Sequence, residues 1–214
     1  MSIKKPENSD SRSTFGALTE EARRISERSQ EIVRDIVGDE SPEGKLKQRV
    51  VMATGDPAFK DLLRFTNNPI NSGVDAIKRG APIYTDIMMV KVGISREAAA
   101  FGSEVVCWLA QDEVGLEQNL TRASTGFRKL GEKLAGSIVV IGNAPSAALT
   151  LADMVDERIV PALIIATPVG FVNAAESKEH IRRLAIPSIT TVGTRGGTPV
   201  AVALVNELIT IAKL

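Results

Sequence analysis

The chain has 214 residues, of which 43% are hydrophobic and 24% are charged, so it can bury the core of one domain and does not have the composition of a disordered protein. Its 26 basic and 26 acidic side chains give a formal net charge of zero, which argues against a general nucleic-acid binder. A single cysteine, Cys107, and a single histidine, His180, exclude a disulfide framework, cysteine-based zinc sites and two-histidine metal motifs. We therefore expect no metal site.

The N-terminal segment is polar and lacks the apolar stretch of a secretory signal. We expect a flexible tail over residues 1–16 and a single α/β domain over residues 17–214. The longest apolar run, around residues 159–172, contains Pro161 and Pro168 and is shorter than the roughly 20 residues that a membrane helix needs. The sequence thus predicts a cytoplasmic, soluble protein without a membrane partner.

Helical periodicity dominates the first part of the chain, and the predicted helices begin at threonine or proline, which suit helix N-termini. We predict helices over residues 18–37, 42–53, 57–65 and 69–79.

From residue 81 onward, short apolar runs alternate with helical stretches. The runs are PIYTD, EVVCWLA, SIVVIGNAP, PALIIATPVG and SITTVG, and the helices are expected over residues 115–134, 146–155, 174–184 and 199–212. Apolar strands separated by helices indicate βαβ crossovers and a parallel sheet covered on both faces. The sequence predicts a three-layer α/β/α sandwich of flavodoxin type, with a five-stranded, mainly parallel sheet and N-terminal helices.

Three loops rich in glycine and proline follow predicted strands, at residues 142–146, 168–172 and 193–199. Ligands of open parallel sheets bind beyond the carboxyl ends of the strands, and helix N-termini favour anions. The loops therefore suggest a ligand with several carboxylates or phosphates, although ordinary βα turns have the same composition. Neither a G-x-G-x-x-G motif nor a phosphate-binding P-loop occurs, so nucleotide binding is not supported.

Four arginines lie near candidate edges of the site: Arg28, Arg49, Arg122 and Arg195. Arginine binds carboxylates with two parallel hydrogen bonds, so a few of them could hold a polyanion despite the zero net charge. The alternative for each is a solvated surface position. Cys107 is expected in the core, because no histidine adjoins it in the sequence to activate it.

Several stretches, in order along most of the chain, resemble the precorrin-8X methylmutase or cobalt-precorrin-8 methylmutase family. The most specific are IGNAPSAAL (141–149), PVGFVNAAESK (168–178) and GTRGGTPVA (193–201). ERS, RVVMATGD, GAPIYTDIMMV and NLTRAS add to the resemblance.

The resemblance implies a flavodoxin-like homodimer that moves a methyl group from C-11 to C-12 of a precorrin during cobalamin biosynthesis. The product is hydrogenobyrinate, or cobyrinate when cobalt is present, and no cofactor is implied. The acetate and propionate arms of the tetrapyrrole suit the anion-binding loops.

The resemblance also implies site residues. The family's acid is the histidine of an R-x-x-H motif, and here that position is Met52, whose thioether has no proton to give. The substrate-binding positions implied are Ser29, Arg49, Thr85, Thr121, Arg122, Asn143, Ser146, Gly170, Phe171, Arg195 and Gly196. A purely structural role is the strongest alternative for Gly170, Phe171 and Gly196, which could shape the backbone and the core instead of binding substrate.

Three hypotheses follow. The first is a methylmutase whose proton comes from solvent or from the ligand. The second is a corrinoid-binding paralogue or carrier without turnover, suggested by Met52. The third, based on fold class alone, is a flavodoxin-like module that binds FMN or a nucleotide.

Overall fold

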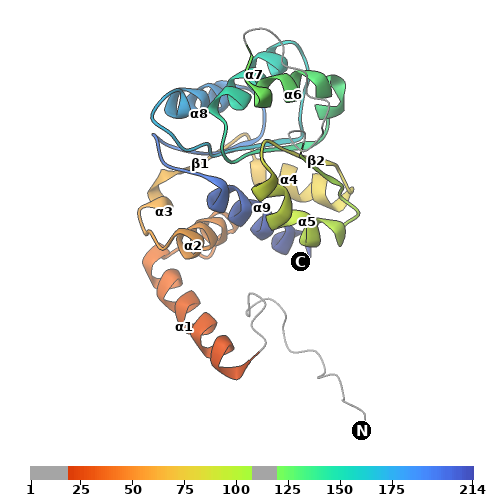
Figure 1. Cartoon of the computed structure of the whole chain (residues 1–214). Helices are drawn as coiled ribbons and strands as arrows, with labels where there is room; N and C mark the ends of the chain where they lie inside the picture. Colours follow the sequence, from red (N-terminus) through yellow and green to blue (C-terminus); the bar gives the residue numbers. More distant parts are fainter. Residues whose placement is uncertain (1–18, 108–119) are drawn as a thin grey trace.

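The computed structural model describes residues 19–107 and 120–214. It contains a six-stranded sheet with the strand order β1-β6-β5-β4-β2-β3. Helices cover both faces of the sheet, and each face has its own cluster of buried hydrophobic residues (Figure 1). The expected tail at residues 1–16 and part of the helix expected at 115–134 lie outside the described residues.

The five parallel strands follow the flavodoxin pattern. They are β2 (Ile83–Thr85), β3 (Val105–Cys107), β4 (Ile138–Ile141), β5 (Leu163–Ala166) and β6 (Ser188–Thr191). Numbered among themselves along the chain, they lie in the order 2-1-3-4-5, which is the flavodoxin order. The predicted three-layer architecture is therefore confirmed.

The prediction of five strands is wrong by one. The segment expected to be a helix at residues 57–65 contains a short helix, α3 (Phe59–Leu62), followed by a sixth strand, β1 (Leu63–Thr66). This strand pairs antiparallel with β6 at the edge of the sheet. Tertiary pairing overrides the local pattern here, because four residues with a proline upstream carry little periodicity of their own.

One helix was also not expected from the sequence. Helix α5 (Met88–Ala99) connects β2 to β3 and buries Val90, Ile94 and Ala98, which are spaced four residues apart. Asn206 of the C-terminal helix donates a hydrogen bond to the Gly93 carbonyl at 3.1 Å, which joins α5 to that helix.

The N-terminal helices have regular caps. Helix α1 (Glu20–Val37) begins after Thr19, whose hydroxyl accepts the Ala22 N–H, and α2 (Pro42–Thr54) begins after Ser41. Both end at glycines in the left-handed conformation. Most of α1 extends away from the body of the molecule, and Val33 is its one buried residue (Figure 1).

The remaining helices form the two outer layers. Helices α6 (Arg122–Leu130), α7 (Pro145–Asp156) and α8 (Ala174–Arg183) cover one face. Helices α4 (Pro69–Lys78) and α9 (Thr198–Ala212) cover the other face together with α2 and α5. A short 3₁₀ helix (Gly131–Leu134) follows α6. No helix in the described part of the chain is both long and apolar enough to span a membrane.

Candidate functional site

The point where the strand order reverses lies between β2 and β4, and the carboxylate of Asp86 occupies it. This side chain, which follows β2, accepts the backbone N–H groups of Gly142 at 2.9 Å, Asn143 at 2.9 Å and Ala144 at 2.7 Å. Burial raises the pKa of Asp86, and the three N–H donors act in the opposite direction. These three N–H groups of the loop are therefore bonded within the protein and are not free for an anionic ligand.

The other two glycine-rich loops hold each other. Gly170 donates its N–H to the Thr194 carbonyl at 3.0 Å, and Gly197 donates to the Thr167 carbonyl at 2.7 Å. A Cβ atom on Gly196 would lie 2.3 Å from the Thr167 oxygen, so only glycine fits there. Both loops thus have a shape fixed by close backbone contact.

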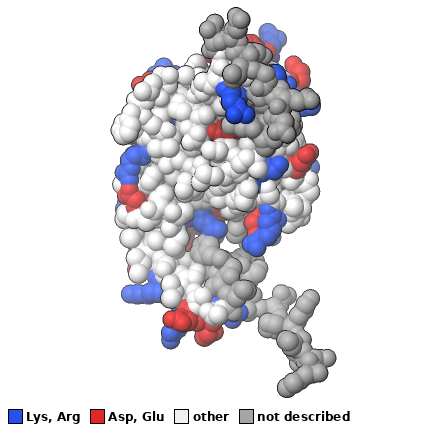
Figure 2. Space-filling model, viewed as in Figure 1, with Lys and Arg blue, Asp and Glu red and all other residues white. Residues whose placement is uncertain are grey.

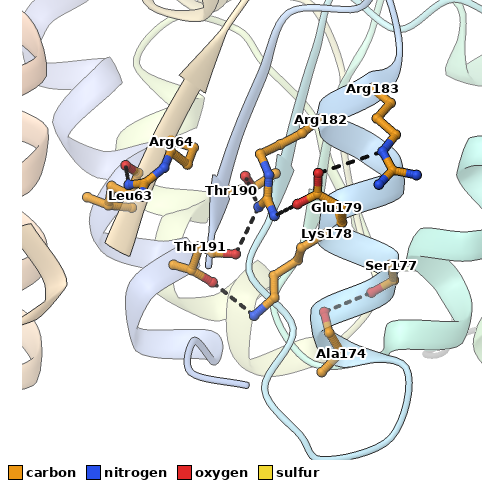
Figure 3. A network of polar contacts seen from close by, with 10 residues as sticks. All are labelled: Leu63, Arg64, Ala174, Ser177, Lys178, Glu179, Arg182, Arg183, Thr190 and Thr191. Atoms are coloured by element: carbon orange, nitrogen blue, oxygen red, sulfur yellow. Dashed lines mark hydrogen bonds and ion pairs between the residues drawn. The ribbon is translucent and has the colours of Figure 1, made fainter. Parts of the chain in front are cut away.

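A buried lysine anchors the loop after β6. Lys178 has no exposed surface, and its Nζ donates to Thr191 Oγ1 at 3.1 Å and to the Arg195 carbonyl at 2.8 Å. Figure 3 shows its side chain reaching from α8 toward Thr191 of β6, while Arg182 bonds Thr190 and pairs with Glu179. Burial, with a smaller contribution from Arg182, lowers the pKa of Lys178 to about 8.

The side chain of Arg195 links this loop to the end of α2. Its guanidinium forms an ion pair with Asp56 and lies over the ring of Phe59, 4.9 Å from the ring centroid. The side chain remains 45% exposed. Arg195 is therefore held in place by protein groups and still faces the outside at the carboxyl edge of the sheet.

Two cavities flank the contact between α2 and α9. The first, of about 300 Å³, is also bordered by α1 and the C-terminus, and the second, of about 390 Å³, reaches Pro199 in the first turn of α9. Arg49 and Met52 line both cavities. Met52 is half-buried and packs against the main hydrophobic core. The two predicted residues that the R-x-x-H motif places one turn apart thus stand together at a hollow surface.

The electrostatics of the first cavity depend on Arg49 and Glu207. Burial lowers the pKa of Arg49, and the charges of Glu207 and Glu97 partly offset this effect. Burial raises the pKa of Glu207, while Arg49 and Lys45 oppose the increase. A half-buried carboxyl therefore lies within electrostatic reach of Arg49 and lines the same cavity as Met52.

A second group of predicted residues gathers at the starts of α6 and α7. Thr121 caps α6, and its hydroxyl lies 2.8 Å from that of Ser146. Arg122 and Asn143 are exposed beside them, whereas Thr85 is 1% exposed and donates its hydroxyl to the Ile87 carbonyl at 3.3 Å. The structure thus brings Thr121 and Ser146 together and leaves the Thr85 side chain covered.

Two further predicted residues lie apart from both groups. Phe171 is 95% exposed, so the alternative that it belongs to the core is wrong. Ser29 lies on α1 in a shallow hollow with Arg24, Ile25 and Arg28, and its hydroxyl donates to the Ile25 carbonyl at 2.8 Å. On the face shown in Figure 2, acidic and basic side chains are scattered among large uncharged areas.

Sequence reasoning did not assign roles to three of these residues. Lys178 was expected only as part of a motif, Asp86 only as a residue at a strand end, and Glu207 not at all. The sequence around Asp86 and Lys178 gives only a weak signal of these roles, because the hydrogen-bond partners are distant. The partners of Asp86 lie 56 to 58 residues away in the sequence, and those of Lys178 lie 13 to 17 residues away. Among residues 19–107 and 120–214, no cluster of three His, Cys, Asp or Glu residues could hold a metal ion.

The strand order defines a flavodoxin-like α/β protein. Its candidate ligand site, the cavities beside α2 and α9, lies outside the crevice in which proteins of that fold usually bind ligands. The family model described as precorrin-8X methylmutase matches residues 24–211. The chain therefore belongs to the precorrin-8X methylmutase family, whose activity is that of an intramolecular isomerase in cobalamin biosynthesis.

Curated relatives and solved structures agree with this assignment. The cobalt-precorrin-8 methylmutase of Methanocaldococcus jannaschii is 41% identical over 93% of this chain and 98% of its own length. The precorrin-8X methylmutase of Pseudomonas aeruginosa is 40% identical over 78% of this chain and 83% of its own. The crystal structure of the Thermus thermophilus precorrin-8X methylmutase is 36% identical, covers 88% of this chain and 97% of its own, and superimposes with a TM-score of 0.82.

Proposed function

We propose that this protein moves the methyl group on C-11 of precorrin-8X, or of cobalt-precorrin-8, to C-12 and releases hydrogenobyrinate or cobyrinate. The reaction is an isomerisation, so no group enters or leaves, and the protein's task is to hold the macrocycle in a reactive shape. The position of Arg49 and Met52 in the walls of both cavities supports this proposal most directly.

The groove between α2 and α9 is the proposed place for the ring edge. It offers the apolar surface of Met52, Val202 and Ala203 to the macrocycle and Arg49 to a carboxylate arm. Arg195 and the group at Thr121, Arg122 and Ser146 lie at separate positions, where further arms of a large substrate could end.

The direct test is to add the precorrin to the purified protein and follow the appearance of the corrin spectrum. Arg49→Ala should weaken product binding, whereas Arg183→Ala serves as the matched control, because Arg183 is exposed on α8 and pairs with Glu179. If turnover does not occur, the proposed activity is wrong. If binding is equally strong in both variants, the proposed location is wrong.

Met52 favours a second candidate function, that of a corrinoid-binding protein without turnover. Methionine cannot donate a proton, so a protein without another acid could bind the corrin product and fail to convert the precursor. Tight binding of hydrogenobyrinate without any conversion of precorrin-8X is the result that would favour this hypothesis.

We also propose a homodimer. The long α1 helix extends from its own domain and exposes Ile25, at 61%, and Ile32, at 46%, which a second copy could cover. Light scattering of the purified chain tests this, and a monomeric mass contradicts it. Assays with precorrin-8X and with cobalt-precorrin-8 test whether the substrate contains cobalt. Cell fractionation tests the proposed cytoplasmic location.

A further inference from the structure

Among the described residues, two carboxyl side chains line the cavity that holds Met52 and Arg49. Glu40 is 61% exposed, pairs with Arg34 at 3.4 Å and accepts a hydrogen bond from Gln48 at 3.0 Å. Glu207 lies on α9 and is half-buried. An exposed, already bonded carboxylate is a poor proton donor. Of these two described side chains, Glu207 is therefore the one suited to act as an acid.

The neighbours of Glu207 fit such a role. Helix α2 presents Lys45 and Arg49 to the cavity, α1 presents Arg34, and Glu97 of α5, which pairs with Lys213, acts on Arg49. The cations favour the charged carboxylate, yet burial outweighs them, and the pKa of Glu207 lies above its usual range. A carboxyl that retains its proton closer to neutral pH is suited to acid catalysis.

We infer that Glu207 supplies the proton that the residue at position 52 cannot supply. This inference rests on the proposed function, because Glu207 and Met52 line the same cavity beside Arg49. Helix α9 therefore carries the acid in place of α2, and Met52 contributes apolar contact with the ring edge.

The proposed step consumes and releases no proton overall. The neutral Glu207 carboxyl gives its proton to a basic atom of the macrocycle, which draws electron density from the ring. The bond between the methyl carbon and C-11 breaks as the bond to C-12 forms. The macrocycle then returns the proton to the Glu207 carboxylate, so enzyme and product leave the cycle with the same number of atoms and electrons as enzyme and precursor.

The test compares Glu207→Gln with Glu43→Gln, a matched change at an exposed position in the first turn of α2. For each protein, kcat is measured from pH 5 to 9 with precorrin-8X, and binding is measured with hydrogenobyrinate. We expect wild-type kcat to fall with rising pH as Glu207 loses its proton. We expect Glu207→Gln to lower kcat about 100-fold, to remove this pH dependence and to leave product binding within about threefold. Glu43→Gln should match the wild type.

A double variant separates proton supply from structural damage. Met52→His combined with Glu207→Gln should recover turnover, because a histidine at position 52 brings a second acid to the same cavity. An unrescued double variant, or a Glu207→Gln protein with the rate and pH profile of the wild type, overturns the inference. A wild-type protein that binds product without turnover also overturns it, whereas one that does neither removes the proposed function itself.

Discussion

The buried amine of Lys178 makes stability depend on pH in an unusual direction. Its hydrogen-bond partners among the described residues, Thr191 and the Arg195 carbonyl, are neutral acceptors and do not compensate the buried charge as a carboxylate would. The pKa of Lys178 falls to about 8 in the folded protein, from the ordinary 10.5. Below pH 8 the amine is charged in both the folded and the unfolded states, and the folded state bears the cost of burial.

The sign and size of the effect follow from proton linkage. Between about pH 8 and 10.5 the unfolded chain binds more protons at this position than the folded one, so the free energy of unfolding rises with pH. Raising the pH from about 7 to about 9.5 should add about 2 kcal/mol through Lys178. The neutral amine retains two N–H donors, which match its two acceptors, so the contacts survive deprotonation.

Urea unfolding of the wild type, Lys178→Met and Lys133→Met at the two pH values measures this contribution. Lys133 is an exposed control. Other groups titrate alike in all three proteins, so the Lys178→Met curve should lack about 2 kcal/mol of the gain that the wild type and the control show. An equal gain in all three proteins would refute the reasoning.

Three further predictions concern the site. Met52→His should raise kcat severalfold in the corrin assay, because it adds a second acid beside Glu207, and an unchanged or lower rate would contradict the assignment of position 52. Gly196→Ala should destabilise the protein by about 1–3 kcal/mol in urea unfolding, because its Cβ would lie 2.3 Å from the Thr167 oxygen, and wild-type stability would show that the loop can move. Asp86→Asn should lower the free energy of unfolding by about 2 kcal/mol or more, because the NH₂ group of asparagine would face backbone N–H donors in place of an accepting oxygen. An unchanged free energy of unfolding would show that the three hydrogen bonds contribute little.

Much of the fold was predictable because its signals are local. Continuous apolar runs marked the five parallel strands, and Thr19, Pro42 and Pro69 marked helix starts. The strand at Leu63–Thr66 was missed because its hydrogen bonds go to β6, more than 120 residues later in the chain. Helix α5 was missed although its apolar residues have helical spacing, because Gly93 and several β-branched residues lower its helix propensity.

The candidate site was less predictable, because its contacts join distant parts of the chain. The motif around Arg49 and Met52 identified two lining residues, but Glu207 comes from a helix more than 150 residues later and has no motif of its own. Phe171 was predicted to bind substrate, with a place in the core as the alternative, and its 95% exposure excludes only the alternative. Spacing along one segment does not reveal the surroundings that the rest of the chain provides.

Asp86 has a consequence for how this architecture could acquire new ligands. Where flavodoxin-type proteins leave room at the reversal of strand order for a bound cofactor, this protein carries its own negative charge, already satisfied by three amides. A phosphate brought to that position would meet a like charge and lose the donors it needs. Redesign toward flavin binding must therefore begin by removing this carboxylate and restabilising the Gly142–Ala144 turn, before any loop is reshaped.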